Sequence, residues 1–581
     1  MIEYCLKLNK SSLHDPAESS DSDPIYKDGV AVIGDVRIDN RRDLQKIEEF
    51  EDSKTDVEII ILLYRKYGDK YIEMIHGAFA FILHDSEKGE LSITRDHLGQ
   101  RIIYYSVKNN VIYISSSIHK LLDFSAFEKK MNLNRVVDLI AHTHSPSSET
   151  FFQGIYYLEP SNIMLFSDTE TTKKEFNYKS QIHVTKNLKE LFYESVASVM
   201  DKNCGSMLSG GLDSSAISSV LQELSTESIQ SFSVVFPELS PELKAKADET
   251  EYSAEVVKKF GMHMNRVPIT KFNFIRNIKE NTAFFEEPFM ATNTYIYEEV
   301  FKAMNMKGVN VVLDGTDGDS VISHGTEIFR HYGDKFEIRK LLKEKRAYDS
   351  VHGINHSTLK TIISFVIVPR VPKWLSRSLK RIKKTDYFHS QNILLSKSYK
   401  KSSKKLYKDV DRIYNTKKSF GNFSEKAHYM MVYKSHWDDV FNILNIIAKK
   451  YSVEIRFPFF YQPLVNYCLN EPVTNKINKG ITRHNFREAL RDQLPEKIYE
   501  RKSKSDLSPI FTENFMNIDV NYLHQVFFDK NSPIYNLMDK NEVKKLLDST
   551  DSKKNLSIIY TCFSLYEWMK KNHFTVNIDK E

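Results

Sequence analysis

The sequence predicts an α/β protein of two domains, and three observations lead to this fold class. The chain has 581 residues, too many for a single hydrophobic core. Residues 1–180 contain short apolar or alternating runs bounded by turn residues, which predicts a strand-rich α+β first domain. From residue 181 to residue 581, strand and helix patterns alternate at first and then become mostly helical, which predicts a parallel sheet with helical additions.

The first domain is expected to contain several strands and one amphipathic helix. Four runs have the strand pattern: residues 29–38, 77–83, 91–94 and 111–115. Residues 56–67 predict a helix with its apolar side chains on one face, namely Val57, Ile60, Ile61 and Tyr64.

The second domain is expected to begin after a boundary within residues 175–186. A helix with apolar positions from Leu188 to Val199 follows this boundary. Further along the chain, residues 231–236 and 309–313 predict strands, and residues 250–260 predict a helix. This order of elements favours a Rossmann-like parallel sheet.

The most informative segment is a phosphate-binding loop between a strand and a helix. It reads Ser209-Gly210-Gly211-Leu212-Asp213-Ser214-Ser215. Two glycines let the backbone approach an anion, and the N–H groups at the helix start point toward it. Asp213 would place a carboxylate beside the phosphates, as expected for a Mg²⁺ ligand. No Gly-Lys-Ser/Thr closes the loop, so the γ-phosphoryl transfer of P-loop enzymes is not expected.

Composition excludes several other classes. The net charge of +5 is small for this length, and no nucleic-acid motif is present. The four cysteines have no CxxC spacing, which argues against a zinc site or a disulfide scaffold and favours a reducing cytoplasm. No signal peptide and no run long enough to cross a membrane is visible, so we expect a cytoplasmic protein with neither membrane nor nucleic-acid partners.

The loop resembles the pyrophosphate loop of ATP pyrophosphatases, and further motifs extend the resemblance to the asparagine synthetase superfamily. The segments that carry it are 35–44, 77–81, 95–105, 114–122 and 154–160 in the first half, and 209–215, 314–319, 454–460 and 501–504 in the second. The resemblance implies an N-terminal Ntn-glutaminase-like sandwich and a C-terminal ATP-pyrophosphatase-type domain. It also implies ATP and Mg²⁺ as cofactors, AMP and pyrophosphate as products, and a new amide bond.

The resemblance also implies roles for individual residues. The pyrophosphate would be held by Ser209, Gly210, Gly211, Asp213, Ser214 and Ser215, and the adenine or ribose by Met207, Leu208 and Val234. Gly315 would let the α-phosphate approach the backbone, and Asp213 and Asp319 would share the metal. Lys504 is the expected catalytic lysine, with Lys502 as the alternative because the spacing to the family's Arg-x-Lys differs by one residue. Glu454 and Arg456 are expected to form a structural ion pair.

Two departures from the family pattern bear on function. The family's glutaminases use a cysteine directly after the initiator Met, where this chain has Ile2, so glutamine hydrolysis is not expected. Cys5 lies inside the first expected strand and is read as a buried structural thiol. The family's acceptor-side glutamate is Thr316 here, which indicates the same activation step with a different amine.

Three functions remain open from the sequence. Residues 313–325 and 501–509 resemble lasso-peptide macrolactam synthetases, which predicts a precursor peptide as the carboxylate substrate and allows a leader-peptidase partner. An ammonia-using asparagine synthetase or a β-lactam-forming relative is the first alternative, and a non-catalytic peptide-binding scaffold is the second. A basic insertion at about residues 340–420 is interpreted either as a solvated helical segment or as a docking surface for an acidic partner.

Overall fold

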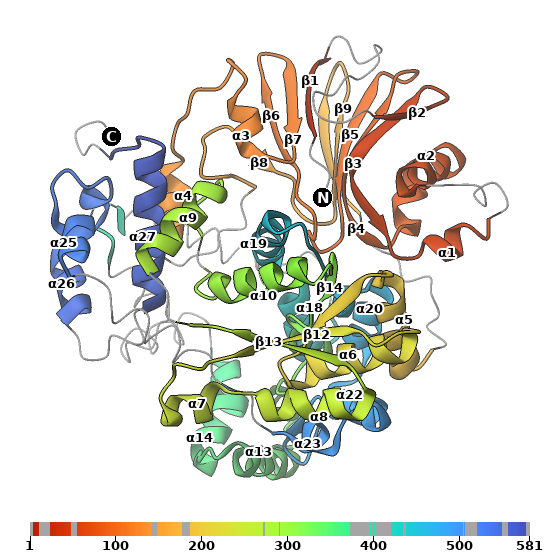
Figure 1. The fold of residues 1–581 in the computed structure, drawn as a ribbon, viewed down its shortest axis with the longest axis vertical. Helices are drawn as coiled ribbons and strands as arrows, with labels where there is room; N and C mark the ends of the chain where they lie inside the picture. The colour runs from red at the N-terminus through yellow and green to blue at the C-terminus, as the bar shows by residue number, and fades with distance from the viewer. Residues whose placement is uncertain are drawn as a thin grey trace.

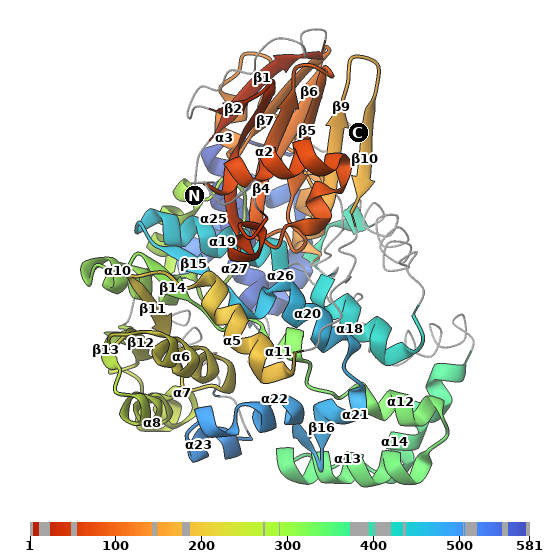
Figure 2. The same cartoon turned by 90° about the vertical axis from the view of Figure 1, so that its right-hand side faces the viewer.

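The computed structural model describes most of the chain: residues 4–10, 24–47, 55–141, 148–176, 186–270, 274–289, 291–371, 394–397, 399–400, 420–433, 437–502, 505, 520–548 and 556–576. The strand-rich N-terminal half lies at one end of the long axis, and the C-terminal part occupies the rest (Figure 1, Figure 2). The expected boundary between residues 180 and 181 falls outside the described residues and stays a prediction.

The N-terminal half is a sandwich of two antiparallel sheets. One sheet has the order β1 (Cys5–Asn9), β7 (Val111–Ser115), β6 (Tyr104–Lys108), β8 (Tyr156–Tyr157). The other has the order β10 (Thr171–Glu175), β9 (Asn162–Phe166), β5 (Glu90–Arg95), β4 (Gly77–Asp85), β3 (Val30–Ile38), β2 (Ile25–Lys27). Leu6, Ile82 and Ile114 belong to a buried cluster between the sheets, which is the layer expected when each sheet buries one face.

Helices cover the outer faces of this sandwich. They are α1 (Arg41–Leu44), α2 (Asp56–Tyr67), the 3-10 helix η3 (Gly68–Met74) and α3 (Ile118–Leu122). A further helix of this part, α4 (Leu133–Ile140), packs against the C-terminal helix α27 (Leu556–Lys571) (Figure 1). The α2 helix begins with a capping box, because Thr55 accepts a hydrogen bond from the Glu58 N–H and Glu58 accepts one from the Thr55 N–H. Its buried side chains pack on β3 and β4 in a second cluster. The four layers confirm the Ntn amidotransferase-type fold that the sequence predicted.

The C-terminal part is built on a five-stranded parallel sheet. Its order is β13 (His263–Pro268), β12 (Gln230–Val235), β11 (Cys204–Met207), β14 (Val311–Leu313), β15 (Glu454–Arg456). The chain reverses its direction of travel across the sheet between β11 and β14, and ligands of such sheets bind at the carboxyl ends of the strands at this point. The predicted Rossmann-like parallel sheet is therefore confirmed.

Helices lie on both faces of this sheet. Figure 1 shows α5 (Leu188–Val199), α6 (Leu212–Leu224) and α8 (Thr250–Phe260) on one side, and α10 (Thr294–Met306) and α19 (Trp437–Lys450) between the sheet and the N-terminal half. Further α-helices of the described residues are α7 (Pro241–Ala247), α9 (Phe274–Phe284), α11 (Gly318–Ile322), α18 (Phe423–Tyr433), α20 (Gln462–Asn470), α21 (Val473–Lys476), α22 (His484–Ala489), α23 (Glu496–Glu500), α25 (Val520–Phe528), α26 (Lys540–Asp548) and α27 (Leu556–Lys571).

A small helical module extends from the end of α11. It contains α12 (Ile328–Asp334), α13 (Ile338–His352), α14 (Thr358–Ile362), the π-helix η4 (Ile363–Ile367) and the 3-10 helix η5 (Val368–Arg370). A separate buried cluster holds it together and includes Ile477 of the hairpin β16 (Ile477–Asn478)–β17 (Ile481–Thr482). Most of the predicted basic insertion beyond residue 371 lies outside the described residues.

Two further expectations concern Cys5 and membranes. Cys5 is 4% exposed in β1, so the first strand contains the buried thiol that the sequence predicted. Within the part of the chain that the structure describes, none of the helices combines the length and apolar character needed to cross a bilayer.

Candidate nucleotide and acyl-transfer site

The predicted phosphate loop connects β11 to α6. Gly210 has φ of +80°, a conformation that L side chains rarely adopt, and an added Cβ would lie 2.5 Å from Tyr252 Cβ. Gly315, two residues after the end of the neighbouring strand β14, lies very close to the start of α6. A Cβ added to Gly315 would lie 2.9 Å from the Ser214 nitrogen. The backbone at Gly315 therefore approaches the start of α6, while the predicted approach of an α-phosphate to Gly315 stays a prediction.

Polar groups line this loop. Ser214 Oγ accepts a hydrogen bond from the Ser209 N–H at 3.2 Å, and Ser209 Oγ accepts one from the Gly211 N–H at 3.2 Å. The N–H groups of the first residues of α6 have no acceptor within the helix. Ser215 Oγ is buried without a hydrogen-bond partner. An anion bound here would meet several donors at once, which fits nucleotide phosphates.

The Asp213 carboxylate is ion-paired in this structure. Arg483 Nη1 lies 2.8 Å from both Asp213 carboxylate oxygens, and the two side chains are only 12% and 14% exposed. Arg483 is the residue before α22 and adopts the left-handed conformation, with φ of +54° and ψ of +36°. Its Nε is buried without a hydrogen-bond partner. This strained, partly satisfied cation faces the loop and is a residue that the sequence analysis missed.

Two further arginines tie the C-terminal segment to the loop. Arg501 donates to the Gly210 carbonyl oxygen at 2.9 Å, to Glu249 at 2.7 Å and to Ser505 Oγ at 2.8 Å. Arg487 on α22 donates to the Arg501 carbonyl oxygen at 2.8 Å, and its burial lowers its pKa to about 10. The segment that starts at Arg501 thus begins beside the phosphate loop.

The structure describes only one of the two lysines considered for catalysis. Lys502 directly follows Arg501 and is exposed. Lys504 lies outside the described residues, so its role stays a prediction.

The carboxyl end of β14 forms the other side of the site. The Asp314 carboxylate accepts a hydrogen bond from the Thr316 N–H at 2.6 Å, and Thr316 Oγ1 lies 3.2 Å from the Tyr297 phenol oxygen. Burial and the Asp314 carboxylate raise the Tyr297 pKa, so its phenol stays protonated and can donate. Asp319 lies 3.5 Å from His324 Nε2.

The residues expected at the adenine or ribose lie at the carboxyl ends of two adjacent strands. Met207 is the last residue of β11 and is paired with Phe232 of β12, and Val234 lies two residues further along β12. Leu208 is buried, and its N–H donates to the Phe232 carbonyl oxygen at 2.9 Å. The fold therefore brings these three residues to the strand ends beside the phosphate loop, while their contacts with a nucleotide stay predictions.

The donor set also fits a divalent cation held jointly with phosphates. Within the described ranges, the structure contains no group of three or more His, Cys, Asp or Glu side chains arranged to hold a metal ion alone. Mg²⁺ in nucleotide sites is usually held by one or two carboxylates together with phosphate oxygens and water. Asp213 and Asp319 are residues of this kind, so the prediction of Mg²⁺ is chemically consistent with the site.

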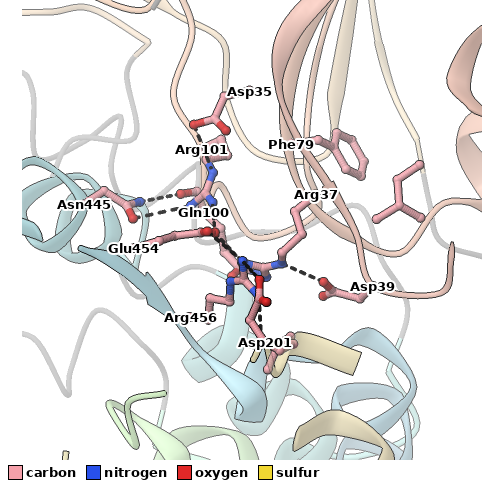
Figure 3. A network of polar contacts seen from close by, with 12 residues as sticks. Asp35, Arg37, Asp39, Phe79, Gln100, Arg101, Asp201, Asn445, Glu454 and Arg456 are labelled. Carbon is pink, nitrogen blue, oxygen red and sulfur yellow. Dashed lines mark hydrogen bonds and ion pairs between the residues drawn. The ribbon is translucent and has the colours of Figure 1, made fainter. Parts of the chain in front are cut away.

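A network of charges joins the N-terminal half to the sheet beside this site (Figure 3). Glu454 of β15 lies 2.8 Å from Arg101 Nη2 and 2.8 Å from Arg456 Nη2, and 3.4 Å from Arg37 Nη1. Burial opposes ionisation of Glu454, but the hydrogen bonds and charges of these arginines outweigh it and lower its pKa. The predicted ion pair between Glu454 and Arg456 is present. The Arg456 carbonyl oxygen accepts the Asp314 N–H at 3.0 Å, so the network ends directly after β14, one residue before Gly315.

Comparison with known proteins agrees with this architecture. Residues 187–570, more than half of the chain, match the family described as Asparagine synthase, and residues 37–177 match the Glutamine amidotransferase domain. The chain belongs to the asparagine synthase family. Its characterised members are ATP-dependent carbon–nitrogen ligases, so the predicted superfamily and ligase class are confirmed.

Several curated relatives match this member of the asparagine synthase family. A Methanocaldococcus jannaschii protein assigned as glutamine-hydrolyzing asparagine synthetase 2 is 29% identical over 56% of this chain and 65% of its own length. Glutamine-hydrolyzing asparagine synthetase 1 of Bacillus subtilis is 23% identical over 94% of this chain and 84% of its own length. The amidase chry2 of Gibberella zeae is 22% identical over 82% of this chain and 76% of its own length. A Bacillus subtilis glutamine PRPP amidotransferase structure covers 50% of this chain at 13% identity with a TM-score of 0.18, a value too low to support a comparison.

Proposed function

We propose that this family member is an ATP-dependent, AMP-forming amide synthetase that closes a macrolactam in a precursor peptide. The observation that carries the proposal is the close approach of Gly315 to Ser214, which brings the acceptor-side strand end to the phosphate loop. A carboxylate held near Thr316 would then lie next to the α-phosphate of an ATP whose pyrophosphate rests on the N-terminus of α6.

The reaction has two steps. A carboxylate oxygen of the substrate attacks the α-phosphorus of ATP, a new P–O bond forms, and pyrophosphate leaves. The amine nitrogen then attacks the carbonyl carbon, AMP leaves with the former carboxylate oxygen, and the amine loses a proton. In this scheme Mg²⁺ supplies charge neutralisation of the phosphates, with Asp213 and Asp319 as its protein ligands.

Arg483 has a role in this scheme that the geometry suggests. Its guanidinium is buried beside the loop and has one donor without a partner. If Asp213 held a metal ion, the Arg483 guanidinium beside the loop would be able to bind phosphate oxygens instead, since a planar guanidinium suits bidentate phosphate contacts. Lys504 is proposed to stabilise charge on the adenylate and on the tetrahedral intermediate.

The residues on the acceptor side of the site favour an amine that belongs to the same peptide as the carboxylate. Thr316 stands where the family's amidating members have a glutamate, and its hydroxyl pairs with the Tyr297 phenol, so this position supplies no carboxylate to receive a proton from ammonia. An amine carried by the same peptide has a high effective molarity at the adenylate, and this reduces the need for a strong base.

Mass spectrometry tests the proposal. The enzyme, ATP and Mg²⁺ are incubated with candidate peptides that carry an acidic side chain and a free N-terminus, and the product is expected to weigh about 18 Da less than the linear peptide, the mass of one water lost in amide formation. The nucleotide product is expected to be AMP. ADP formation would contradict the assignment of the loop.

Aspartate with ammonia is the second candidate substrate pair. It is favoured by the match to a protein named asparagine synthetase over 94% of this chain. Efficient asparagine formation, together with no dehydrated peptide, would replace the macrolactam proposal with this one.

A further inference from the structure

The helical module between α12 and η5 carries an unusual concentration of exposed apolar side chains. Six of the large hydrophobic residues that are exposed in the described structure lie within residues 336–368: Phe336, Ile354, Leu359, Ile363, Ile367 and Val368. Leu359 is 67% exposed and Ile367 is 50% exposed. Scattered exposed apolar residues are ordinary, but a contiguous group marks an interaction site.

Three of these residues form a line along one helical segment, called here the α14 stripe: Leu359, Ile363 and Ile367. Residues four apart in an α-helix drift by about 40° around the axis. The π-helical turn over Ile363–Ile367 has more residues per turn, so it turns the next side chain back toward the same line. The opposite face of the segment is already used, because Thr361 and Val366 are buried in the module.

The surroundings of the α14 stripe are basic. Residues 338–371 contain seven Lys and Arg residues but only two acidic residues. Both acidic side chains face inward, since Glu344 accepts the Gly480 N–H at 2.7 Å and Asp349 is bonded to Lys345 and His356. Among the described residues, Lys343 and Lys360 are exposed and have no acidic partner. An acidic occupant would therefore gain ion pairs at Lys343 and Lys360 without competition from acidic side chains in the described parts of the chain.

The module is also connected to the phosphate site. The added Cβ of Gly480 would lie 2.5 Å from the Ala347 backbone, so the hairpin β16–β17 is seated directly on α13. The hairpin ends at Thr482, and the next residue is Arg483, which holds Asp213. A ligand on the α14 stripe would thus bind to the same structural unit that positions the Arg483 guanidinium.

We propose that the α14 stripe is a docking surface for an acidic, amphipathic peptide segment of the substrate. This inference rests on the proposed function. It identifies a second part of the protein, away from the reacting groups, to which the substrate peptide binds. Apolar side chains of the peptide would cover Leu359, Ile363 and Ile367, and its carboxylates would lie beside Lys343 and Lys360. The area is continuous with the substrate-activating part of the molecule, which favours a peptide over a lipid surface as the occupant.

Fluorescence anisotropy on the full-length protein without ATP tests this proposal. The probe is a labelled 16-residue peptide of glutamate and leucine with leucine at helical i, i+3 and i+4 spacing. Two control peptides replace all glutamates by lysine or all leucines by serine. Saturable binding of the first peptide alone is expected, with affinity that falls as salt is added.

Amino-acid substitutions in the α14 stripe and at the two lysines beside it test where the peptide binds. The triple variant Leu359→Ser, Ile363→Ser, Ile367→Ser should weaken binding at least about tenfold, and Lys343→Glu with Lys360→Glu should weaken it by a similar factor. All five side chains are exposed, so folding is not at risk. Met306→Ser and Lys307→Glu, also exposed but on α10 and just after it, are the matched controls and should leave binding unchanged.

Other outcomes overturn the proposal. They are binding of the triple variant within twofold of the natural protein, equal binding of the lysine peptide, or no saturable binding below about 1 mM. A variant-sensitive interaction with anionic phospholipid vesicles but not with the peptide would assign the surface to a membrane. A shift from dimer to monomer in the triple variant, seen by sedimentation, would assign it to a second copy. ATP is absent from every binding measurement, so the binding results do not depend on whether the enzyme forms AMP. The separate mass-spectrometry assay with ATP tests AMP formation, so failure of the proposed function and failure of this docking proposal give different results.

Discussion

Arg483 places Nη1 2.8 Å from both carboxylate oxygens of Asp213, across 270 residues of sequence. The contact joins the start of α6 to the start of α22 and closes one side of the phosphate loop. It also gives the mostly buried Asp213 carboxylate a counterion, so removal of either partner alone would leave a charge uncompensated.

Breaking this pair from one side should be costly. Arg483→Met leaves the Asp213 carboxylate buried without its cation and is expected to lower the free energy of unfolding by about 2–4 kcal/mol. Asp213→Asn with Arg483→Met should recover most of this loss, because no charge is then left unpaired. Chemical denaturation is applied to the natural protein, to Arg483→Met, to Asp213→Asn and to the double variant. A loss in the double variant equal to the sum of the two single losses would show that the ion pair carries no coupling.

The two lysines after Arg501 give a matched pair of variants for catalysis. Lys504→Ala should leave ATP binding largely intact and lower product formation by on the order of 10², since its charge is needed as the intermediate forms. Lys502→Ala removes the same charge from an exposed position and should change the rate little. Calorimetry with ATP and product quantification by mass spectrometry measure the two effects. The reverse result would move the catalytic role to Lys502.

Local sequence signals predicted much of the fold because they act over a few residues. The helix expected over residues 56–67 is found at Asp56–Tyr67, since the Thr55 capping box begins it and Gly68 ends it. The strand expected over 309–313 is shorter, at Val311–Leu313, because the Val309 N–H instead donates to Met304 and closes the end of α10. In both cases the hydrogen-bond partner lies within five residues.

The same reasoning could not find the contacts that complete the site. Arg483 and Tyr297 reach their partners through the tertiary fold, and no local pattern marks them. Glu454 and Arg456 were expected as a pair, yet Arg37 and Arg101 join them from a different part of the chain. The phosphate loop was predictable because a strand, two glycines and a helix start are contiguous in sequence.

The N-terminal half should not hydrolyse glutamine. Ile2 stands where the family's nucleophile is expected, and Cys5 is buried in β1, so no accessible thiol is present at the start of the chain. Glutamate release from glutamine, with and without ATP, is expected to equal the enzyme-free blank. Release that disappears in Cys5→Ala would contradict this prediction.

Glu287 should make stability depend on pH. Burial raises its pKa from 4.5 to about 7, against the hydrogen bond that it accepts from the Phe151 N–H. Between pH 4.5 and 7 the folded protein holds a proton that the unfolded chain has lost, so this residue's contribution to stability falls as pH rises through this window.

The variant Glu287→Gln keeps the acceptor for Phe151 and removes the titration. It should be more stable than the natural protein at pH 8 and similar at pH 5. Melting temperatures at both pH values measure this difference, and Glu238→Gln, an exposed carboxylate, is the control. A stabilisation that is the same at both pH values would show that the Glu287 proton is not responsible.

Tyr297 and Thr316 should act together on the acceptor side. Their hydroxyl oxygens are 3.2 Å apart, and Thr316 is held by the Asp314 carboxylate at the end of β14. Tyr297→Phe and Thr316→Val should each lower amide formation by about tenfold, the loss expected for one hydrogen bond made in a buried reacting site. AMP formation without amide should persist in both, because the phosphate loop is unchanged.

A variant with both substitutions tests whether the two hydroxyl groups act as one unit or contribute independently to amide formation. If the two hydroxyl groups form one hydrogen-bonded unit, Tyr297→Phe with Thr316→Val should be no slower than either single variant. Tyr193→Phe, which removes a phenol on α5 that is hydrogen-bonded to Glu223 of α6, controls for loss of a hydroxyl elsewhere. Losses that multiply in the double variant would mean that Tyr297 contacts the substrate directly, rather than through Thr316.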